Sequence, residues 1–184
     1  LLAIAISCAS AAFYFWGIFR REIRPHMFTY IVWVTMLGIG FAAQHVSGAG
    51  AGSWNLLAHL TANSGILVLS IWYGEKNITR SDWLALLAAL SAIPVWLITH
   101  DPLWAIVILS LIDLLAIMPT YRKSWVDPWH EGARSFFLGA LSSVAALFAM
   151  EVYSLTTILY TATIMTLDGL LVVMLIFRRW QVGR

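Results

Sequence analysis

Residues 16–26 read WGIFRREIRPH, and residues 118–130 read MPTYRKSWVDPWH. Each stretch follows a long apolar run and places two basic residues directly after an aromatic residue, with a proline and a histidine a few positions later. Shared hydrophobicity alone does not produce this polar pattern twice. The chain is therefore expected to contain an internal repeat.

A second pair of segments supports the repeat. Residues 64–73, SGILVLSIWY, align without a gap with residues 168–177, DGLLVVMLIF. The first copy is then expected over residues 1–80 and the second over residues 102–184. Residues 81–101 form a linker between the two copies.

The composition indicates a membrane protein. Of the 184 residues, 61% are hydrophobic and 11% are charged, whereas soluble domains carry about 25% charged residues. This balance excludes soluble globular, disordered and nucleic-acid-binding proteins. Seven apolar runs approach the roughly 20 residues that a helix needs to cross a bilayer. They cover residues 1–19, 27–47, 54–73, 83–99, 103–121, 134–151 and 154–177.

These runs predict helices, because lipid disfavours unpaired backbone groups and the runs lack the alternation of barrel strands. We expect an all-α integral membrane protein with seven transmembrane helices. The eleven basic residues all follow the first, third, fifth or seventh run. The positive-inside rule then places the N-terminus outside and the C-terminus in the cytoplasm. Since each copy contains three helices and the linker crosses once, the plan is 3+1+3 with parallel repeats.

With this plan, the chain resembles PQ-loop proteins and the related SWEET transporters. The family's Pro-Gln pair corresponds here to Pro119-Thr120, and the first copy has Gly17-Ile18 at that place. Residues 122–131, RKSWVDPWHE, are also similar to a group of uncharacterised bacterial membrane proteins near that family. The resemblance implies a multi-pass carrier of the bacterial inner membrane that works by alternating access, with Pro119 and Thr120 as a hinge.

Two acidic residues fall near the middle of predicted spans, Asp113 in 103–121 and Asp168 in 154–177. An ionisable group at that depth costs at least about 2.5 kcal/mol, so each one needs a reason. No lysine or arginine is deep enough to pair with either of them. Each carboxyl is therefore expected to be protonated, hydrated in a cavity or hydrogen-bonded to polar neighbours.

The third span supplies further candidates. His59 and Asn63 are four residues apart and share one helical face, and Ser64 is the repeat counterpart of Asp168. SWEET-like proteins hold their substrate with polar residues at mid-depth of the third helix of each half. The resemblance thus implies a pocket lined by Asn63, Ser64 and Asp168, with Asp113 nearby and His59 as a further candidate.

Other polar or small residues are expected to be structural. Gln44 and His45 are expected at the outer membrane interface. Residues 48–53, GAGAGS, are expected to form a plain turn on the outer side, with a lid as the alternative. Small residues of the first and sixth spans, Ser7 and Ser142 among them, are expected to allow close helix packing.

The function expected from these features is transport of a small polar solute, with coupling to protonation of one of the two aspartates as an option. The alternative is a non-transporting accessory or assembly subunit of a larger membrane complex. We expect no enzyme, cofactor or metal site, because the chain shows no catalytic constellation and has one cysteine. The expected partners are the lipid bilayer and the solute, without nucleic acid. A homo-dimer and a membrane-complex partner both stay open.

Overall fold

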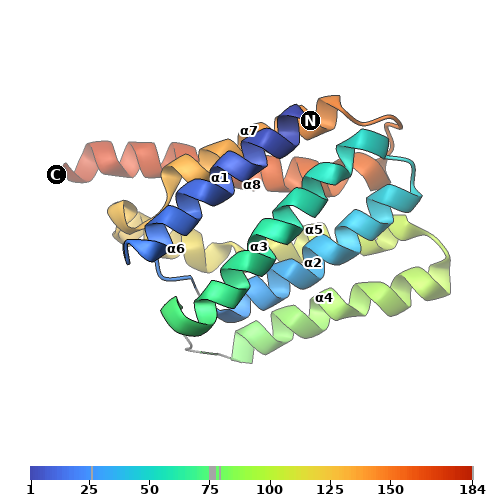
Figure 1. The fold of residues 1–184 in the computed structure, drawn as a ribbon. Coiled ribbons are helices and arrows are strands. Elements are labelled where there is room, and N and C mark those ends of the chain that lie inside the picture. The colour runs from blue at the N-terminus through green and yellow to red at the C-terminus, as the bar shows by residue number, and fades with distance from the viewer. Residues whose placement is uncertain (26, 75–77, 79, 184) are drawn as a thin grey trace.

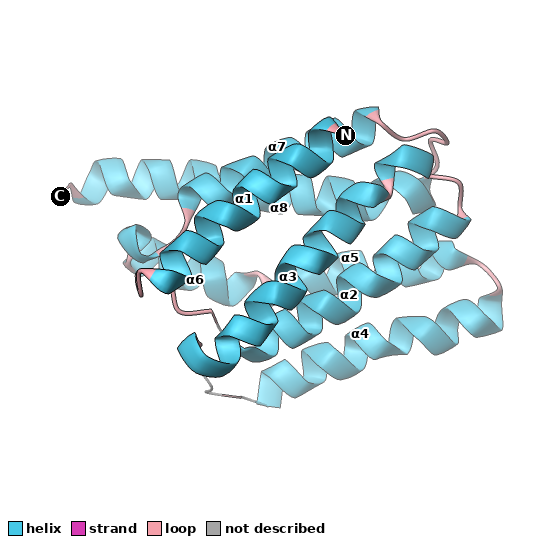
Figure 2. Ribbon diagram, viewed as in Figure 1, coloured by secondary structure: helices cyan, strands magenta, loops and turns pink. Residues whose placement is uncertain are grey.

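The structure, a computed structural model, describes residues 1–184 except residues 26, 75–77, 79 and 184. The described chain is helical and contains no strand (Figure 2). Its α-helices are α1 (Leu2–Phe19), α2 (Met27–Val46), α3 (Trp54–Tyr73), α4 (Arg80–Thr99), α5 (Pro102–Ala116), α6 (Met118–Val126), α7 (Ala133–Phe148) and α8 (Leu155–Val182). Two short 3₁₀ helices, η1 (Gly50–Gly52) and η2 (Pro128–His130), lie between them.

Five helical segments among the described residues are long and apolar enough to cross a membrane: α1, α2, Gly50–Tyr73, Pro102–Val126 and α8. The predicted fourth and sixth spans coincide with shorter apolar helices, Leu86–Thr99 within α4 and Ala133–Phe148. All seven predicted runs therefore fall on helices, and the all-α class, with helices compatible with a membrane, is confirmed. The predicted fifth span is interrupted at Ile117, where α5 ends and α6 begins.

Side chains fix where two of the helices begin. Asp101 precedes α5, and its carboxylate accepts a hydrogen bond from the Leu103 backbone N–H at 2.9 Å, while Pro102 occupies the first helical position. Ser154 and Thr157 form a reciprocal capping box at the start of α8. Such caps satisfy backbone donors that the first helical turn leaves unpaired.

Six of the helices pack in a closed ring (Figure 1). Around the ring, α1 packs on α3, α3 on α2, α2 on α5, α5 on α8, α8 on α7, and α7 again on α1. In each predicted half, the third helix thus lies between the other two. The linker helix α4 lies outside the ring, where it packs on α2 and α5.

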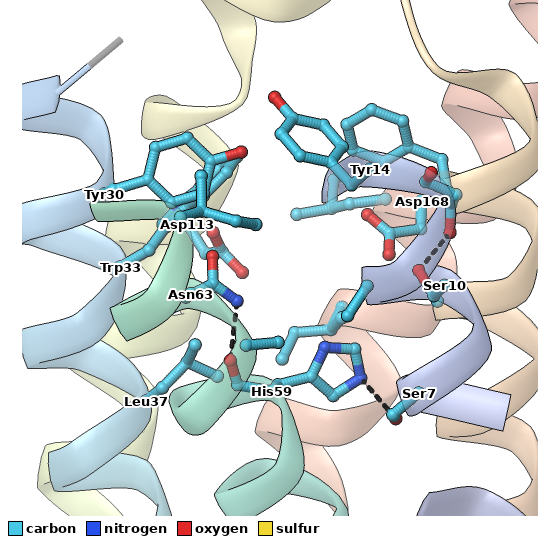
Figure 3. A pocket seen from close by; sticks show the side chains of 18 of the residues that line it. Ser7, Ser10, Tyr14, Tyr30, Trp33, Leu37, His59, Asn63, Asp113 and Asp168 are labelled. Atoms are coloured by element: carbon cyan, nitrogen blue, oxygen red, sulfur yellow. Dashed lines mark hydrogen bonds between the residues drawn. The ribbon is translucent and has the colours of Figure 1, made fainter. Parts of the chain in front are cut away.

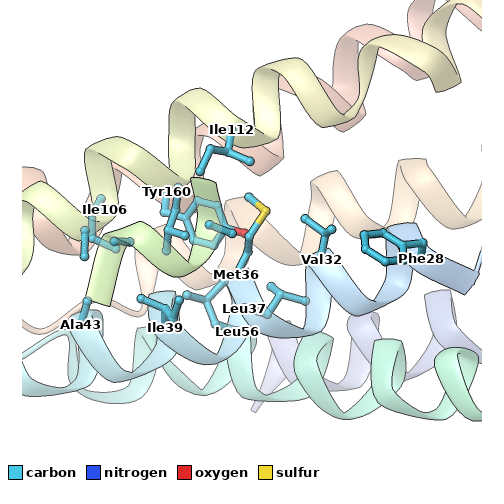
Figure 4. Packing of buried hydrophobic residues seen from close by; sticks show 14 residues of the cluster. Phe28, Val32, Met36, Leu37, Ile39, Ala43, Leu56, Ile106, Ile112 and Tyr160 are labelled. Atoms are coloured by element: carbon cyan, nitrogen blue, oxygen red, sulfur yellow. The ribbon is translucent and has the colours of Figure 1, made fainter. Parts of the chain in front are cut away.

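The largest cluster of buried apolar side chains lies where α2 meets α4, α5 and α8 (Figure 4). Its members include Phe28, Val32 and Met36 of α2, Ile106 of α5 and Tyr160 of α8. Many large apolar side chains of α4 and α8 remain exposed on the outside of the bundle. Continuous exposed apolar surface of this kind fits a lipid environment.

The bundle has two distinct ends, which are named here for the chain terminus that each contains (Figure 1). The N-terminal end contains the loops between α2 and α3, α4 and α5, and α7 and α8. The C-terminal end contains α6, η2 and the segment after α1. The described lysines and arginines all lie in segments at the C-terminal end.

Candidate functional site

A cavity of about 130 Å³ lies between the helices of the ring (Figure 3). All six ring helices contribute to its wall. A cavity of this size holds several water molecules or a small solute. The polar or aromatic side chains that line it are Ser7, Ser10, Tyr14, Tyr30, Trp33, His59, Asn63, Asp113, Ser135, Phe136, Tyr160 and Asp168.

The structure brings together four of the five predicted ligand residues. His59, Asn63, Asp113 and Asp168 all line the cavity, although they come from α3, α5 and α8. Ser64 is not among the lining residues, and its hydroxyl donates to the Leu60 carbonyl oxygen in its own helix at 2.8 Å. The cavity face of α3 consists of residues 59, 62, 63 and 66, which follow helical spacing. Ser64 lies off that face.

Asp113 is the more deeply buried of the two acids, with 7% of its surface exposed. The Trp33 side chain lies beside it, yet the Trp33 indole N–H is itself buried without a completed hydrogen bond. The carboxyl and this indole lie together at one wall of the cavity, and the carboxyl can accept further hydrogen bonds from a water or a ligand.

The carboxyl of Asp168 lies against Gly139 of α7, where the absence of a side chain leaves room for it. A Cβ atom added to Gly139 of α7 would lie 2.7 Å from Oδ2 of Asp168. Any larger residue at position 139 would therefore displace this carboxyl. The Tyr121 hydroxyl of α6 also donates to the carbonyl oxygen of Leu167, directly before Asp168, at 2.6 Å.

This tyrosine connects the acid to the predicted hinge. Thr120 lies in the first turn of α6, beside the break at Ile117, and Ile117 itself lines the cavity. The side chain of Pro119 lies outside the part that the structure describes. A movement of α6 relative to α5 would thus reach both the cavity wall and the backbone next to Asp168.

His59 connects three helices at the opposite side of the cavity from Tyr14 and Tyr30 (Figure 3). Its Nε2 lies 3.1 Å from Oγ of Ser142 and 3.4 Å from Oγ of Ser7. The Ser142 hydroxyl donates to the Gly139 carbonyl oxygen at 2.7 Å, and the Ser7 hydroxyl donates to Oδ1 of Asn55 at 2.8 Å. Both hydroxyls therefore present lone pairs to the imidazole, and Nε2 carries the proton. In the neutral ring, Nδ1 is then an acceptor.

The N-terminal end of the bundle is closed by two interlocked loops. The Glu151 backbone N–H donates to the Ala49 carbonyl oxygen at 3.2 Å, and the Ala51 N–H donates to the Glu151 carboxylate at 3.2 Å. Gly52 packs so closely that an added Cβ would overlap the Met150 sulfur. Residues 48–53, expected to form a plain turn, instead pack against the loop between α7 and α8.

Gln44 reinforces this closure, and its predicted interfacial position was wrong. Its side chain is fully buried. Its amide donates to the Thr157 carbonyl oxygen at 2.8 Å and to the Thr161 hydroxyl at 2.9 Å. These bonds join α2 to α8 between the interlocked loops and the cavity. The neighbouring His45 is exposed.

No three histidine, cysteine, aspartate or glutamate side chains gather into a metal-binding group within the described residues. No family model matches the sequence, and no curated protein or solved structure matches it. Function must therefore be inferred from the cavity and its closure.

Proposed function

We propose that this chain is a membrane transporter that moves a small polar solute by alternating access through the central cavity. The observation that carries the proposal is a polar cavity walled by all six ring helices and closed at one end by interlocked loops. Two carboxyl groups without a lysine or arginine beside them are costly in an apolar bundle. A cavity that was only a packing defect would not explain why they are there. A solute site requires polar groups at this depth and closure on one side at a time.

The packing order supports a PQ-loop or SWEET-like arrangement of two parallel three-helix repeats. Superposing the halves in chain order pairs α1 with α5, α2 with α7 and α3 with α8. The contact between α1 and α7 then corresponds to the contact between α5 and α2. The weaker contacts across the ring, α2 with α8 and α3 with α7, are also exchanged by this pairing.

The charge distribution supports the proposed orientation in a bacterial inner membrane. The described basic residues at the C-terminal end would face the cytoplasm under the positive-inside rule. The interlocked loops would then close the outer side. The cavity, which reaches from His59 past Asp168 to Tyr14, would lie toward the cytoplasmic half of the bundle.

Movement between two states would use the break at Ile117. We propose that α6, with Pro119 and Thr120, swings relative to α5 and carries the Tyr121 contact to the backbone beside Asp168. Protonation of Asp113 or Asp168 is a proposed means of coupling solute movement to a proton gradient, because either acid changes its charge on binding a proton.

A thermal-shift panel on the purified protein tests the proposal. Sugars, amino acids, nucleosides and vitamins are added at two pH values, and a ligand of the folded state raises the unfolding midpoint by mass action. We expect at least one such ligand, with its shift lost in Asp168→Asn and kept in Asp101→Asn. Asp101 is a matched control because it lies outside the cavity and asparagine also caps helices.

The absence of any ligand across the panel, together with a stoichiometric partner in mild detergent, would contradict the proposal. That outcome would favour an accessory or assembly subunit instead.

A further inference from the structure

Three polar side chains around the cavity direct donor hydrogens to other groups of the protein. The Ser10 hydroxyl donates to the Ser135 carbonyl oxygen at 2.8 Å, and the Asn63 amide donates to the His59 carbonyl oxygen at 2.8 Å. The Nε2 hydrogen of His59 is directed to the two serine hydroxyls described above. Asn63 keeps its amide oxygen and a second amide hydrogen, and His59 keeps the Nδ1 lone pair, so two acceptors remain among these groups.

Acidic side chains are the second feature of the cavity wall. Asp113 and Asp168 turn their carboxyls toward the cavity (Figure 3). No lysine or arginine side chain in the described part of the chain lines it. Within the described residues, the hydrogen-bonding neighbour of Asp113 is the Trp33 indole, which carries no charge. An occupant that brings positive charge and donor hydrogens would compensate both acids.

Aromatic rings complete the wall. Tyr14, Tyr30, Trp33, Phe136 and Tyr160 come from four different ring helices and all line the cavity. Tyr14 and Tyr30 have ring centroids 6.1 Å apart, and Tyr30 and Trp33 have centroids 5.3 Å apart. Aromatic faces attract cations through their quadrupole, most strongly where water is excluded. The rings and the acids thus favour the same kind of occupant.

We infer that the solute is a small organic cation with N–H donors, such as an alkylammonium or a guanidinium, bound between the two aspartates and the aromatic wall. This inference rests on the proposed function, since it takes the cavity to be the solute site. The carboxyl of Asp113 or Asp168, the Asn63 amide oxygen and His59 Nδ1 accept from the cationic group. The rings surround the carbon skeleton.

Other occupants fit the same wall less well. An anion would face two carboxyls without a compensating cation. A divalent metal would need more ligands, and the described residues provide no group of three metal-binding side chains. A polyol requires donors as well as acceptors from its site, and the donors left here are the second Asn63 amide hydrogen, the Trp33 N–H and the tyrosine hydroxyls.

A series of three compounds with one skeleton tests the charge preference directly. 4-Amino-1-butanol, 1,4-butanediol and 4-hydroxybutyrate share a four-carbon chain with a terminal hydroxyl and differ in the charge of the other head group. Apparent dissociation constants are obtained from the unfolding midpoint as a function of concentration. We expect the ammonium compound to bind at least tenfold more tightly than the diol, and the carboxylate not to bind.

Asp113→Asn and Asp168→Asn are then titrated with 4-amino-1-butanol, with Asp101→Asn as the matched control. Each cavity variant is expected to weaken binding at least tenfold, and the control to leave it unchanged. The ranking of the three compounds is measured on the unaltered protein, so it stands even where a variant fails to fold. Equal binding by all three aspartate variants would place the ammonium outside the cavity and overturn the inference.

The remaining outcomes separate this inference from the proposed function. The inference that the solute is a cation would be overturned by any of three results. These are equal binding of the diol, tighter binding of the carboxylate, and binding only of an uncharged member of the larger panel. Each would leave the cavity as a solute site. Failure of this series and of the larger panel would overturn both.

Discussion

Substituting Gly52 by alanine is expected to open the N-terminal end of the bundle. A Cβ at this position would overlap the Met150 sulfur and would lie 3.1 Å from the Ala146 carbonyl oxygen. The Met150 side chain can move, but the Ala146 carbonyl belongs to the α7 backbone, so we expect strain at this contact to push the loop away from that helix. Overpacking of this kind costs about 1–3 kcal/mol. The overlap exists only while the loops are together, so it destabilises the closed arrangement and not the open one.

The ratio of closed to open molecules should therefore fall by roughly 5- to 150-fold. Pulsed electron paramagnetic resonance measures it, with spin labels at Val46 and Leu155 in a Cys8→Ser background. Both labelled positions are exposed, on α2 and α8 beside the interlocked loops. We expect one short distance in the parent protein and an added longer distance in Gly52→Ala.

Gly38→Ala is the matched control, because a Cβ at Gly38 of α2 meets nothing within 4 Å. It should leave the distance distribution of the parent protein unchanged. The reasoning is refuted if Gly52→Ala shows the same single short distance as Gly38→Ala. In that case the loops accommodate the methyl group without separating.

Three further changes test other parts of the structure. Gln44→Leu removes two hydrogen bonds to α8, worth about 0.5–1.5 kcal/mol each, so the thermal midpoint should fall; an unchanged midpoint contradicts this. Gly139→Ala brings a Cβ within 2.7 Å of Asp168 Oδ2 and should weaken solute binding in thermal-shift titrations, whereas Gly169→Ala should not. Ser154→Ala removes the cap of α8 and should cost about 0.5–2 kcal/mol in denaturant unfolding, with solute affinity unchanged.

The helices and the two acids were predictable from sequence for physical reasons. A long apolar run in lipid must pair its backbone groups within the protein, and a helix does so within the run itself. Helices could therefore be predicted directly from these runs. Asp113 and Asp168 stood out because an ionisable residue in such a run is rare and costly. Asp113 and Asp168 are far apart in the sequence, but the repeat made it possible to anticipate that they would line one cavity.

The hydroxyl groups could not be sorted in the same way. Ser7 and Ser64 are the same residue type in similar apolar helices, yet Ser7 lines the cavity and Ser64 bonds to its own helix. Thr163 and Thr166 of α8 also donate to carbonyl oxygens one turn back. Which choice a hydroxyl makes depends on the rotation of its helix against its neighbours, which weakly amphipathic helices do not reveal.

One signal for the missed residues was present in α1. Ser7, Ser10, Ala11 and Tyr14 line the cavity, and their spacing of three or four residues marks one helical face. The closure at the N-terminal end had no such signal. It depends on a contact between Gly52 and α7, about a hundred residues away in the chain.

The most direct test of the central proposal is flux across a membrane. The solute with the largest thermal shift is supplied as a radiolabelled compound to liposomes that contain the purified protein. The proposal predicts saturable uptake that is lost in Asp168→Asn and kept in Asp101→Asn. Binding that is specific to the cavity without any uptake above protein-free liposomes, under inward or outward solute and proton gradients, would contradict it.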